Sequence, residues 1–476
     1  MKNRFDVIVV GAGPVGLWIG CELKLARIDV AVIERRSEPT AQSRALTIHG
    51  RSLEVFALRG IADRLLSTGR PIPTGHYAVL DTRLDFSRFD TRFPYTLFIP
   101  QAVTEAKLEE HALELGVDLR RGVSVQGVEN KGDQVHVATD TGELIADYVV
   151  GADGARSIVR EQARIAYEGH DARNTLMLGD VVLGVPPAAP VVSVTNERGL
   201  VMMAPLGDGK HYRIVMVDPE QMHVPRSEPV TLDQLAKPVA HITGQEFEPR
   251  DPIWMSRFTD ETRLAATYNK GRILLAGDAA HIHAPMGGQG MNVGLQDAMN
   301  LGWKLAAVVK GEAPATMLDS YTAERRPVGD ALYANTLAQV GLVTRFDPAT
   351  LALRATLNDL LGIPAVNRRL AGELSGFDVA YGSDAKAALS AGRLAEGVRI
   401  PDVDITVNET TSPIYSLLAK GNWLHIAFDA GVEASSPDWL RRERIRFVTA
   451  KPFDHAAFIG LRAVLVRPDG YVSSFE

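Results

Sequence analysis

The chain opens with a glycine-rich turn of the kind that binds dinucleotides. Gly11, Gly13 and Gly16 follow an apolar run with the spacing Gly-x-Gly-x-x-Gly. The first glycine allows a tight turn, the second lets the backbone approach a pyrophosphate, and the third allows close packing of helix on strand. A helix starting at Pro14 would direct its N-terminus at the phosphates, and Glu34 can accept hydrogen bonds from both ribose hydroxyls. The motif predicts a dinucleotide site without distinguishing FAD from NAD; the alternative is a glycine turn that binds nothing.

Two later segments supply that distinction. Residues 149–157 and 274–281 resemble signatures of FAD-dependent hydroxylases related to para-hydroxybenzoate hydroxylase. The resemblance implies FAD as the cofactor, with Asp278 at the position of the aspartate that holds its ribityl and pyrophosphate part. It continues through the following loop and helix as far as Lys304.

The glycine loop at residues 287–292 has a chemical reason to lie beside a flavin. Reduced flavin carries negative charge near its pyrimidine edge, and amides at a helix N-terminus stabilise negative charge. Met291 and Asn292 stand where a helix is expected to begin, and we expect them to supply those amides. The alternative is a helix-capping loop that contacts no ligand.

Three further positions match elements of the same family. Asp153 lies in a second fingerprint that helps to hold FAD and contributes to the NADPH path, Arg44 in an element that approaches the pyrophosphate, and Gln101 where relatives contact FAD. The alternatives are an N-cap role for Asp153, a solvated Arg44 and an ordinary helix start at Gln101. The full set of cofactor-binding candidates is Gly11, Gly13, Pro14, Val15, Gly16, Glu34, Arg35, Arg44, Gln101, Val125, Asp153, Asp278, Pro285, Gly288, Gly290, Met291 and Asn292.

The Gly-x-Gly-x-x-Gly motif occurs once, so the sequence offers no second nucleotide domain. This matches enzymes in which NADPH or NADH visits transiently, reduces the flavin and leaves, and Cys21 alone cannot supply the redox pair of a disulfide reductase. The resemblance implies that reduced flavin and O2 then form a flavin hydroperoxide, which an electron-rich ring attacks. No catalytic base and no metal ligand is assigned, and His281 and His283 are interpreted as parts of the flavin loop.

These residues must be positioned by an α/β fold in which strands and helices of one nucleotide domain are separated by an insertion. We expect a helix over residues 52–66 and a βαβ-like tail from Trp423 to Val472. The fold class is a discontinuous Rossmann-like FAD domain with an inserted β-sheet substrate domain and a thioredoxin-like C-terminal domain. The expected boundaries are 1–75, 100–179 and 268–390 for the FAD domain, 76–99 and 180–267 for the substrate domain, and 391–476 for the C-terminal domain.

The inserted sheet should cover the reactive face of the flavin. Aromatic and methionine side chains conform to flat ring systems, which makes Met202, Met203, Trp254 and Phe258 candidates for substrate contact. Phe258 is preferred, because relatives carry a similar segment beside the substrate site. Arg213 is a candidate for contact with substrate or NADPH. The alternatives are core residues and a solvated strand arginine.

Across most of its length the chain resembles polyketide hydroxylases and rifampicin monooxygenases. Residues 467–471 are similar to a strand and turn near the end of their thioredoxin-like domain, without Cys-x-x-Cys. Relatives continue beyond this turn, which leaves open a shortened last domain. Ala284 and Met286 depart from the family's residues beside the flavin. The resemblance implies hydroxylation of a polycyclic or phenolic aromatic compound; inactivation of a rifamycin or tetracycline antibiotic and a non-catalytic flavin-binding or ligand-sensing protein are the alternatives.

Composition limits the partners further. A net charge of -7 leaves no broad basic surface for nucleic acid, and no apolar run reaches the length of a membrane span. The single cysteine and the absence of a signal-peptide pattern favour a cytoplasmic protein. We expect a monomer or homodimer whose partners are a small aromatic substrate and O2.

Overall fold

The computed structural model describes residues 2–40, 43–189, 191–429, 431–451 and 453–476. Its largest sheet has β1 at the centre, with β2 and β11 as parallel neighbours and the order β19-β20-β11-β1-β2-β8. The sheet forms because its central strands are continuous apolar runs, buried on both faces. Its strands are β1 (Arg4–Val10), β2 (Val30–Glu34), β8 (Asp118–Arg121), β9 (Val125–Asn130), β10 (Val135–Thr139), β11 (Gly142–Gly151), β19 (Asn269–Lys270) and β20 (Ile273–Leu275).

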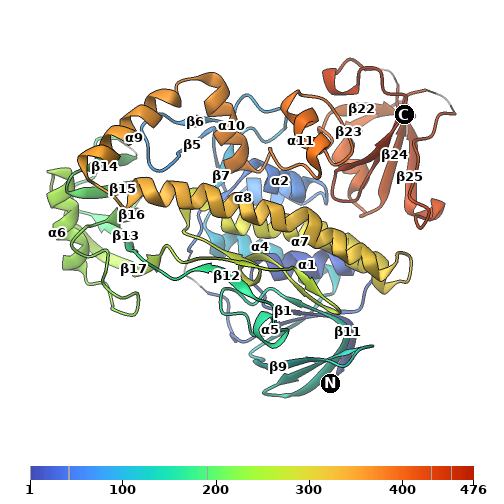
Figure 1. The fold of residues 1–476 in the computed structure, drawn as a ribbon, viewed down its shortest axis with the longest axis horizontal. Coiled ribbons are helices and arrows are strands. Elements are labelled where there is room, and N and C mark those ends of the chain that lie inside the picture. Colours follow the sequence, from blue (N-terminus) through green and yellow to red (C-terminus); the bar gives the residue numbers. More distant parts are fainter. Residues whose placement is uncertain (1, 41–42, 190, 430, 452) are drawn as a thin grey trace.

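Helices from distant parts of the sequence pack against this sheet or against one another (Figure 1). The helix expected over residues 52–66 is two helices, because Gly60 adopts φ +72° and turns the chain between them. The helices are α1 (Pro14–Leu25), α2 (Gly50–Ala57), α3 (Ala62–Leu66), α4 (Gln101–Leu115), α5 (Ile158–Gln162), α7 (Gly290–Val309), α8 (Asp319–Val343), α9 (Pro348–Leu360), α10 (Pro364–Ser375) and α11 (Ser383–Ser390). In Figure 1, α8 crosses the middle of the molecule from the C-terminal strands to the green sheet.

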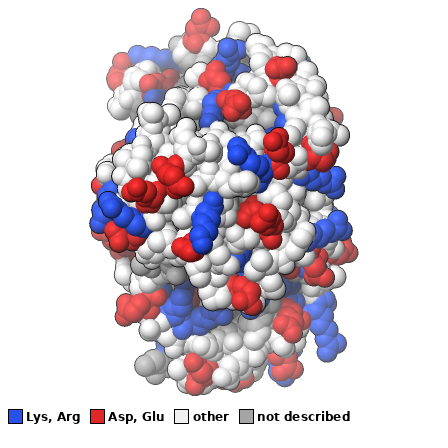
Figure 2. All heavy atoms as spheres, turned by 90° about the vertical axis from the view of Figure 1, so that its left-hand side faces the viewer, with Lys and Arg blue, Asp and Glu red and all other residues white. Residues whose placement is uncertain are grey.

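That second sheet is antiparallel, with the order β14-β15-β16-β13-β17, and α6 (Leu232–Thr243) covers one of its faces. Its strands are β13 (Thr175–Leu183), β14 (Val192–Asn196), β15 (Gly199–Pro205), β16 (His211–Val217) and β17 (Pro249–Thr259). On the side of the molecule shown in Figure 2, basic and acidic side chains are interspersed, and Lys237 pairs with Asp233 on α6 at 2.9 Å. The mixed α/β fold class is therefore confirmed, while the domain boundaries remain predictions.

The C-terminal strands form a sheet of order β25-β24-β26-β27, with β24 and β25 parallel and the other pairs antiparallel. The βαβ-like tail has its parallel strands but, in the described residues between them, a single 3-10 turn in place of the α-helix. This connection contains Gly431 and Pro437, which disfavour a helix interior. The strands are β24 (Trp423–Ala427), β25 (Ile445–Thr449), β26 (Ala463–Val466) and β27 (Val472–Phe475).

Small sheets of two or three strands complete the architecture. They are β3 (Thr47–Ile48), β4 (Arg70–Ile72) and β7 (Thr96–Phe98); β5 (Thr74–Gly75) and β6 (Leu84–Asp85); β12 (Tyr167–His170), β18 (Thr262–Ala265) and β21 (His281–Ile282); and β22 (Asp404–Val407) and β23 (Thr410–Pro413). Among the described residues, no helix is both long enough and apolar enough to cross a membrane.

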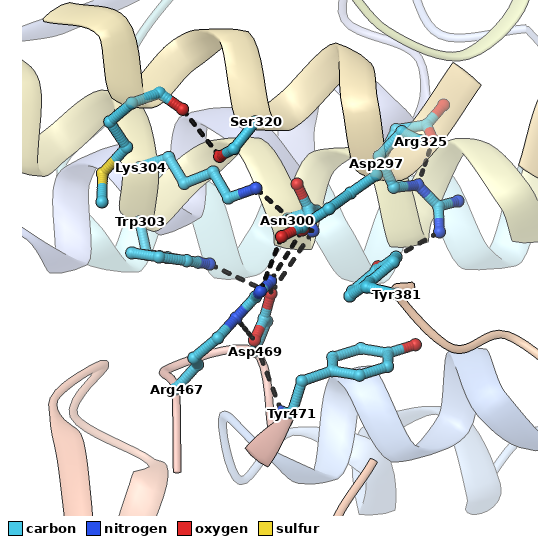
Figure 3. A network of polar contacts seen from close by, with 12 residues as sticks. Asp297, Asn300, Trp303, Lys304, Ser320, Arg325, Tyr381, Arg467, Asp469 and Tyr471 are labelled. Carbon is cyan, nitrogen blue, oxygen red and sulfur yellow. Dashed lines mark hydrogen bonds and ion pairs between the residues drawn. The ribbon is translucent and has the colours of Figure 1, made fainter. Parts of the chain in front are cut away.

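A buried polar network holds the C-terminal turn against α7 and α8 (Figure 3). Arg467 donates to both carboxylate oxygens of Glu324, at 2.8 and 2.9 Å, and to Asp469. Trp303 donates its Nε1–H to Asp469 at 3.1 Å, and Lys304 donates to Glu324 at 2.8 Å. Burial raises the pKa of Glu324, but the charges of Arg467 and Lys304 hold it well below its usual range. Trp303 and Lys304, the last residues of the segment that resembles the family, thus connect α7 to the C-terminal turn through Asp469 and Glu324.

We predict that Asp469→Asn lowers the free energy of unfolding by about 3 kcal/mol, because Arg467 loses a buried, charged partner. Urea unfolding followed by tryptophan fluorescence measures the change. Asp429→Asn is the matched control, since Asp429 and its partner Arg462 are both more than half exposed, at 59% and 56%, and should change stability by less than about 1 kcal/mol. Equal effects from the two substitutions would contradict the role of the network.

Candidate cofactor and substrate site

The three glycines of the first turn have different surroundings. A Cβ on Gly11, which adopts φ +106°, would lie 2.3 Å from the carbonyl oxygen of Ala152, and one on Gly16 would lie 1.9 Å from that of Gly11. A Cβ on Gly13 would meet no protein atom within 4 Å. Two glycines are therefore required by packing, whereas Gly13 leaves open space at the N-terminus of α1. That space and the unpaired amides of a helix start fit a pyrophosphate.

Glu34 holds the glycine turn from the end of β2. Its carboxylate accepts hydrogen bonds from the Ala12 amide at 3.0 Å and from the amide and Nε of Arg36, also at 3.0 Å. Burial raises the pKa of Glu34, but these donors bring it below its ordinary value, so the group is ionised at neutral pH. Arg35 is exposed, whereas Arg36, which no sequence motif marks, makes the contact with Glu34. Val125 starts β9, two residues after the Val123 amide that donates to the Glu34 carbonyl.

Asp278 lies three residues after the end of β20, in a 3-10 turn whose Gly277 packs against Val15 at the start of α1. The space between α1 and α7 is narrow here, since a Cβ on Gly294 would lie 2.6 Å from Val15 and 3.1 Å from Gly277. Asp278 is exposed to solvent, yet enough protein surrounds it for desolvation to raise its pKa, against the charges of His281 and Arg44. The carboxylate is thus accessible beside the positive end of α1, as a group binding ribityl hydroxyls would be.

The segment containing Arg44 is fixed from two sides. Gln101 accepts a hydrogen bond from the Ala45 amide at 3.1 Å. Arg213 donates to the carbonyl oxygens of Arg44, at 3.0 Å, and Ser43, at 2.6 Å. Its guanidinium also pairs with the buried Asp180. Arg213, a candidate for substrate or NADPH contact, therefore ties the substrate sheet to the Arg44 segment, while the Arg44 side chain itself is exposed.

The glycine loop and the start of α7 present unpaired donors. The backbone amides of Gly290, Met291 and Asn292 make no hydrogen bond within the described part of the chain. The Asn292 side chain is occupied, accepting from the His49 amide at 2.7 Å and donating to Thr47 and Gly288 carbonyls at 3.0 and 2.9 Å. Three free amides at the positive end of a 20-residue helix fit the anionic edge of a reduced flavin.

His49 is a part of this site that sequence reasoning missed. Its Nε2 lies 2.8 Å from the Gly287 carbonyl and its Nδ1 lies 2.8 Å from the Thr96 hydroxyl. Burial lowers the pKa of His49 to about 4, so the ring is neutral and donates to Gly287. No motif pointed to it, because its role depends on two segments that are distant in sequence.

The remaining cofactor candidates occupy the same region. Ser157, and not Asp153, caps α5, although Asp153 accepts from the Val159 amide at 3.3 Å. The buried Oδ1 of Asp153 has no hydrogen-bond partner among the described residues. Pro285 precedes the 3-10 turn of the glycine loop, and a Cβ on Gly288 would lie 2.3 Å from Thr47 Oγ1. Contact of these residues with FAD remains a prediction.

The two histidines of the loop have structural partners. His281 Nε2 lies 2.7 Å from Asp297, which also accepts from Arg325 at 2.7 Å. His283 Nδ1 lies 2.6 Å from the Ala284 carbonyl, and burial lowers its pKa to about 4. Among the described residues, no group of three or more His, Cys, Asp or Glu side chains has an arrangement that would hold a metal ion.

The substrate sheet offers one face to the flavin loop. Met202 and Phe258 are partly exposed and pack with Met286 and Ala284 in one apolar cluster, which we call the apolar wall. Met203 is fully buried on the opposite face against α6, since neighbouring residues of a strand point to opposite sides. It is not part of the wall.

Trp254 is on the flavin side of the sheet, but its polar edge is occupied. It donates its Nε1–H to Asp180 at 2.8 Å, and the Arg213 guanidinium lies 5.6 Å from its ring centroid. Trp254, Asp180 and Arg213 form a polar row across three strands. The row lies on the same face of the sheet as the apolar wall, and Arg213 connects it to the Arg44 segment.

Comparison with known proteins gives the same picture over nearly the whole chain. A family model described as FAD binding domain matches residues 4–336, and one described as aromatic-ring hydroxylase, C-terminal, matches residues 394–474. The chain is 42% identical to an uncharacterised aromatic compound monooxygenase of Bacillus subtilis (strain 168), over 99% of this chain and 94% of that protein.

It is 39% identical to a rifampicin monooxygenase of Streptomyces venezuelae, over 98% of this chain and 95% of the relative. Among solved structures, an anhydrotetracycline hydroxylase from Streptomyces rimosus is similar with a TM-score of 0.88 and 37% identity, covering 99% of this chain and 95% of that one.

The glycine turn generates a prediction that separates cofactor binding from folding. Gly13→Ala places a methyl group in the open space of the turn and should weaken FAD binding by roughly tenfold or more while leaving the thermal stability of the FAD-free protein unchanged. Gly16→Ala should destabilise the fold itself, because its Cβ overlaps a backbone oxygen. FAD titration and thermal unfolding distinguish the two. Full FAD affinity in Gly13→Ala would refute the assignment of the pyrophosphate site.

His49 generates a prediction about pH. Because its folded-state pKa, about 4, lies below the ordinary 6.5, its contribution to stability is complete above pH 6.5 and is lost as the pH falls toward 4. The loss amounts to about 3 kcal/mol at most. We expect His49→Gln to remove this part of the pH dependence of thermal unfolding, whereas His223→Gln, at an exposed position, leaves it intact. Identical pH profiles for all three proteins would contradict the buried neutral ring.

Proposed function

The chain belongs to the FAD-dependent aromatic-ring hydroxylases and is a flavoprotein monooxygenase, and from that premise we propose that it hydroxylates a fused-ring phenol using electrons from NADPH or NADH. The observation that carries the proposal is the convergence of the free amides of α7 with the apolar wall. The negative charge of a reduced flavin and the flat surface of a polycyclic substrate would then meet at the same loop.

When bound, FAD supplies the activation of oxygen, and the protein supplies position and a dry site. The glycine turn, Glu34 and Asp278 would hold the nucleotide part. The amides of Met291 and Asn292 would stabilise charge at the flavin edge. Met202 and Phe258 would align the substrate ring and exclude water.

The size of the apolar wall supports a polycyclic substrate. It combines residues of the substrate sheet, the flavin loop and α8, and all of its partly exposed members except Leu357 are aromatic or methionine side chains. The relatives named for anhydrotetracycline and rifampicin act on large substrates with fused rings. We infer a substrate of that class, with one phenolic ring presented to the flavin.

NADPH or NADH would approach the flavin from the solvent-exposed side of the Arg44 segment. Arg44 is exposed next to Asp278 and supplies a positive charge for the phosphates of a nicotinamide nucleotide. A transient visit fits a chain whose sequence carries one dinucleotide motif. We further infer a cytoplasmic monomer or homodimer, consistent with a single, buried cysteine.

A direct test incubates the FAD-loaded protein with NADPH, anhydrotetracycline and isotopically labelled O2. We expect substrate to accelerate flavin reduction and one labelled oxygen atom to appear in the product by mass spectrometry. NADPH consumption that yields only hydrogen peroxide with a panel of fused-ring phenols would support the non-catalytic, ligand-sensing alternative instead.

Adjacent methionines provide a matched pair of variants. Met202→Ala should raise KM for the aromatic substrate by roughly tenfold through lost apolar contact, with little change in stability. Met203→Ala should lower the free energy of unfolding by about 2–5 kcal/mol with KM unchanged, because Met203 fills the core under α6. Steady-state kinetics and urea unfolding measure both. A larger KM effect from Met203→Ala would place the substrate on the other face of the sheet.

The second candidate function is inactivation of an antibiotic by the same oxygen insertion. It is favoured by the similarity to a rifampicin monooxygenase over 98% of the chain. Product masses after incubation with rifampicin and with tetracyclines decide between the two. If both drugs remain unmodified while a fused-ring phenol is oxygenated, the result supports aromatic hydroxylation and excludes inactivation of these antibiotics.

A further inference from the structure

A strained turn forms part of the apolar wall. Ala78 and Val79 adopt φ +49° and +55°, in the left-handed region that side chains rarely occupy. A β-branched residue such as Val79 is particularly unfavourable there. Such backbone conformations persist only where the surroundings enforce them, and they concentrate at functional sites.

Both residues contribute to the apolar wall. Ala78 is fully buried and Val79 is 8% exposed, and they belong to the same apolar cluster as Met202, Phe258 and Met286. Tyr77, the residue before them, is partly exposed and packs on that cluster. The turn therefore closes the wall from a segment outside the main substrate sheet, and its backbone conformation sets where these side chains stand.

Arg354 of α9 clamps the turn. Its Nη1 donates to the carbonyl oxygens of Ala78 and Leu342, each at 3.0 Å, and its Nη2 donates to the Val79 carbonyl at 3.3 Å and the Thr195 hydroxyl at 3.2 Å. The side chain is buried, and it forms no salt bridge within the described part of the chain. The charge of Asp81 favours the charged form of Arg354 without a direct salt bridge, and a buried arginine that no carboxylate contacts is expensive to maintain unless its donors are satisfied. Here its donors satisfy the two carbonyls that a left-handed turn directs inward.

Gln339 of α8 holds the same turn from the amide side and connects it to the flavin loop. Its Oε1 accepts from the Ala78 amide at 3.0 Å, and its Nε2 donates to Asn335 at 2.7 Å. Gln289 donates to Asn335 at 3.4 Å and to the Met286 carbonyl at 3.1 Å. A chain of amide side chains thus links the turn to the residue that forms the flavin side of the wall.

We propose that the turn at residues 77–80 determines substrate specificity by fixing the depth of the apolar wall, and that Arg354 and Gln339 are the positioning residues that hold it. This inference rests on the proposed function and extends it to a selectivity for rigid, fused rings. A wall held at constant distance from the flavin loop accepts a flat ring system and excludes thicker or flexible molecules. Neither positioning residue touches the substrate; both act through the turn.

The test uses the full-length, FAD-loaded protein and the variant Arg354→Met. Anhydrotetracycline binding is measured without NADPH, from the perturbation of the flavin spectrum, so that turnover is not required. We expect roughly tenfold weaker binding, a larger rise in KM than fall in kcat, and unchanged FAD content. Hydrogen exchange should accelerate at the amides of Ala78, Val79 and Leu80, which bond Gln339, His76 and Tyr77 respectively.

Two further variants separate positioning from general packing. Arg368→Met is the matched control, since Arg368 is exposed on α10 and donates to the Arg88 carbonyl at 2.7 Å, away from the wall; it should leave binding unchanged. Ala78→Gly in the Arg354→Met background should restore part of the affinity, because glycine adopts a positive φ without strain. Loss of affinity without rescue would mean that Arg354 acts through core packing and would overturn the proposal.

The exchange measurement keeps this inference distinct from the proposed function. Faster exchange in the turn with unchanged anhydrotetracycline affinity would overturn the specificity role while leaving the monooxygenase assignment intact. Failure of the wild-type protein to oxygenate any fused-ring phenol would refute the proposed function, whatever the turn does. Unchanged exchange in Arg354→Met would refute the clamp itself.

Discussion

The free amides at the start of α7 are the feature on which the rest of the structure depends. A helix N-terminus can stabilise a ligand's negative charge only if two conditions are met. Its position must be fixed, and its first backbone amides must not donate to other groups of the protein. Asn292 and His49 achieve the first by tying the glycine loop to β3 and α2. Their bonds engage side chains and carbonyls and leave the amides of Gly290 to Asn292 free. The far half of the same helix is fixed by Trp303 and Lys304 in the C-terminal network, so the two ends of α7 have different tasks.

The substrate sheet is organised by the alternation of its strands. One set of residues builds a core with α6, and the other faces the flavin loop, where it divides into the apolar wall and the polar row. The polar row reaches the Arg44 segment through Arg213. The sheet that would receive the substrate is thereby bonded to the segment beside the cofactor site, which gives a physical route by which substrate position and cofactor position depend on each other.

Much of this arrangement could be predicted from the sequence, and the limits have physical causes. The strand, turn and helix of the first motif are local, so Gly11, Gly13, Gly16 and Glu34 could be placed without tertiary information. Met203 is a sequence candidate for substrate contact, but the structure buries it under α6, as the alternation of adjacent strand residues between opposite faces already indicates. His49, Arg36 and Arg354 act through partners distant in sequence, and no local pattern marks them. The helix expected over residues 52–66 is interrupted at Gly60, whose positive φ turns the chain.

A crystal structure of the protein with FAD bound would test directly whether the amides of α7 bind the flavin. We expect the pyrophosphate over Gly13 at the N-terminus of α1, the ribityl chain beside Asp278, and the pyrimidine edge of the flavin within hydrogen-bonding distance of the amides of Met291 and Asn292. The isoalloxazine ring should face Met202 and Phe258. A flavin whose pyrimidine edge contacts other groups, with the α7 amides bonded to water or protein, would contradict the role of these amides in flavin binding.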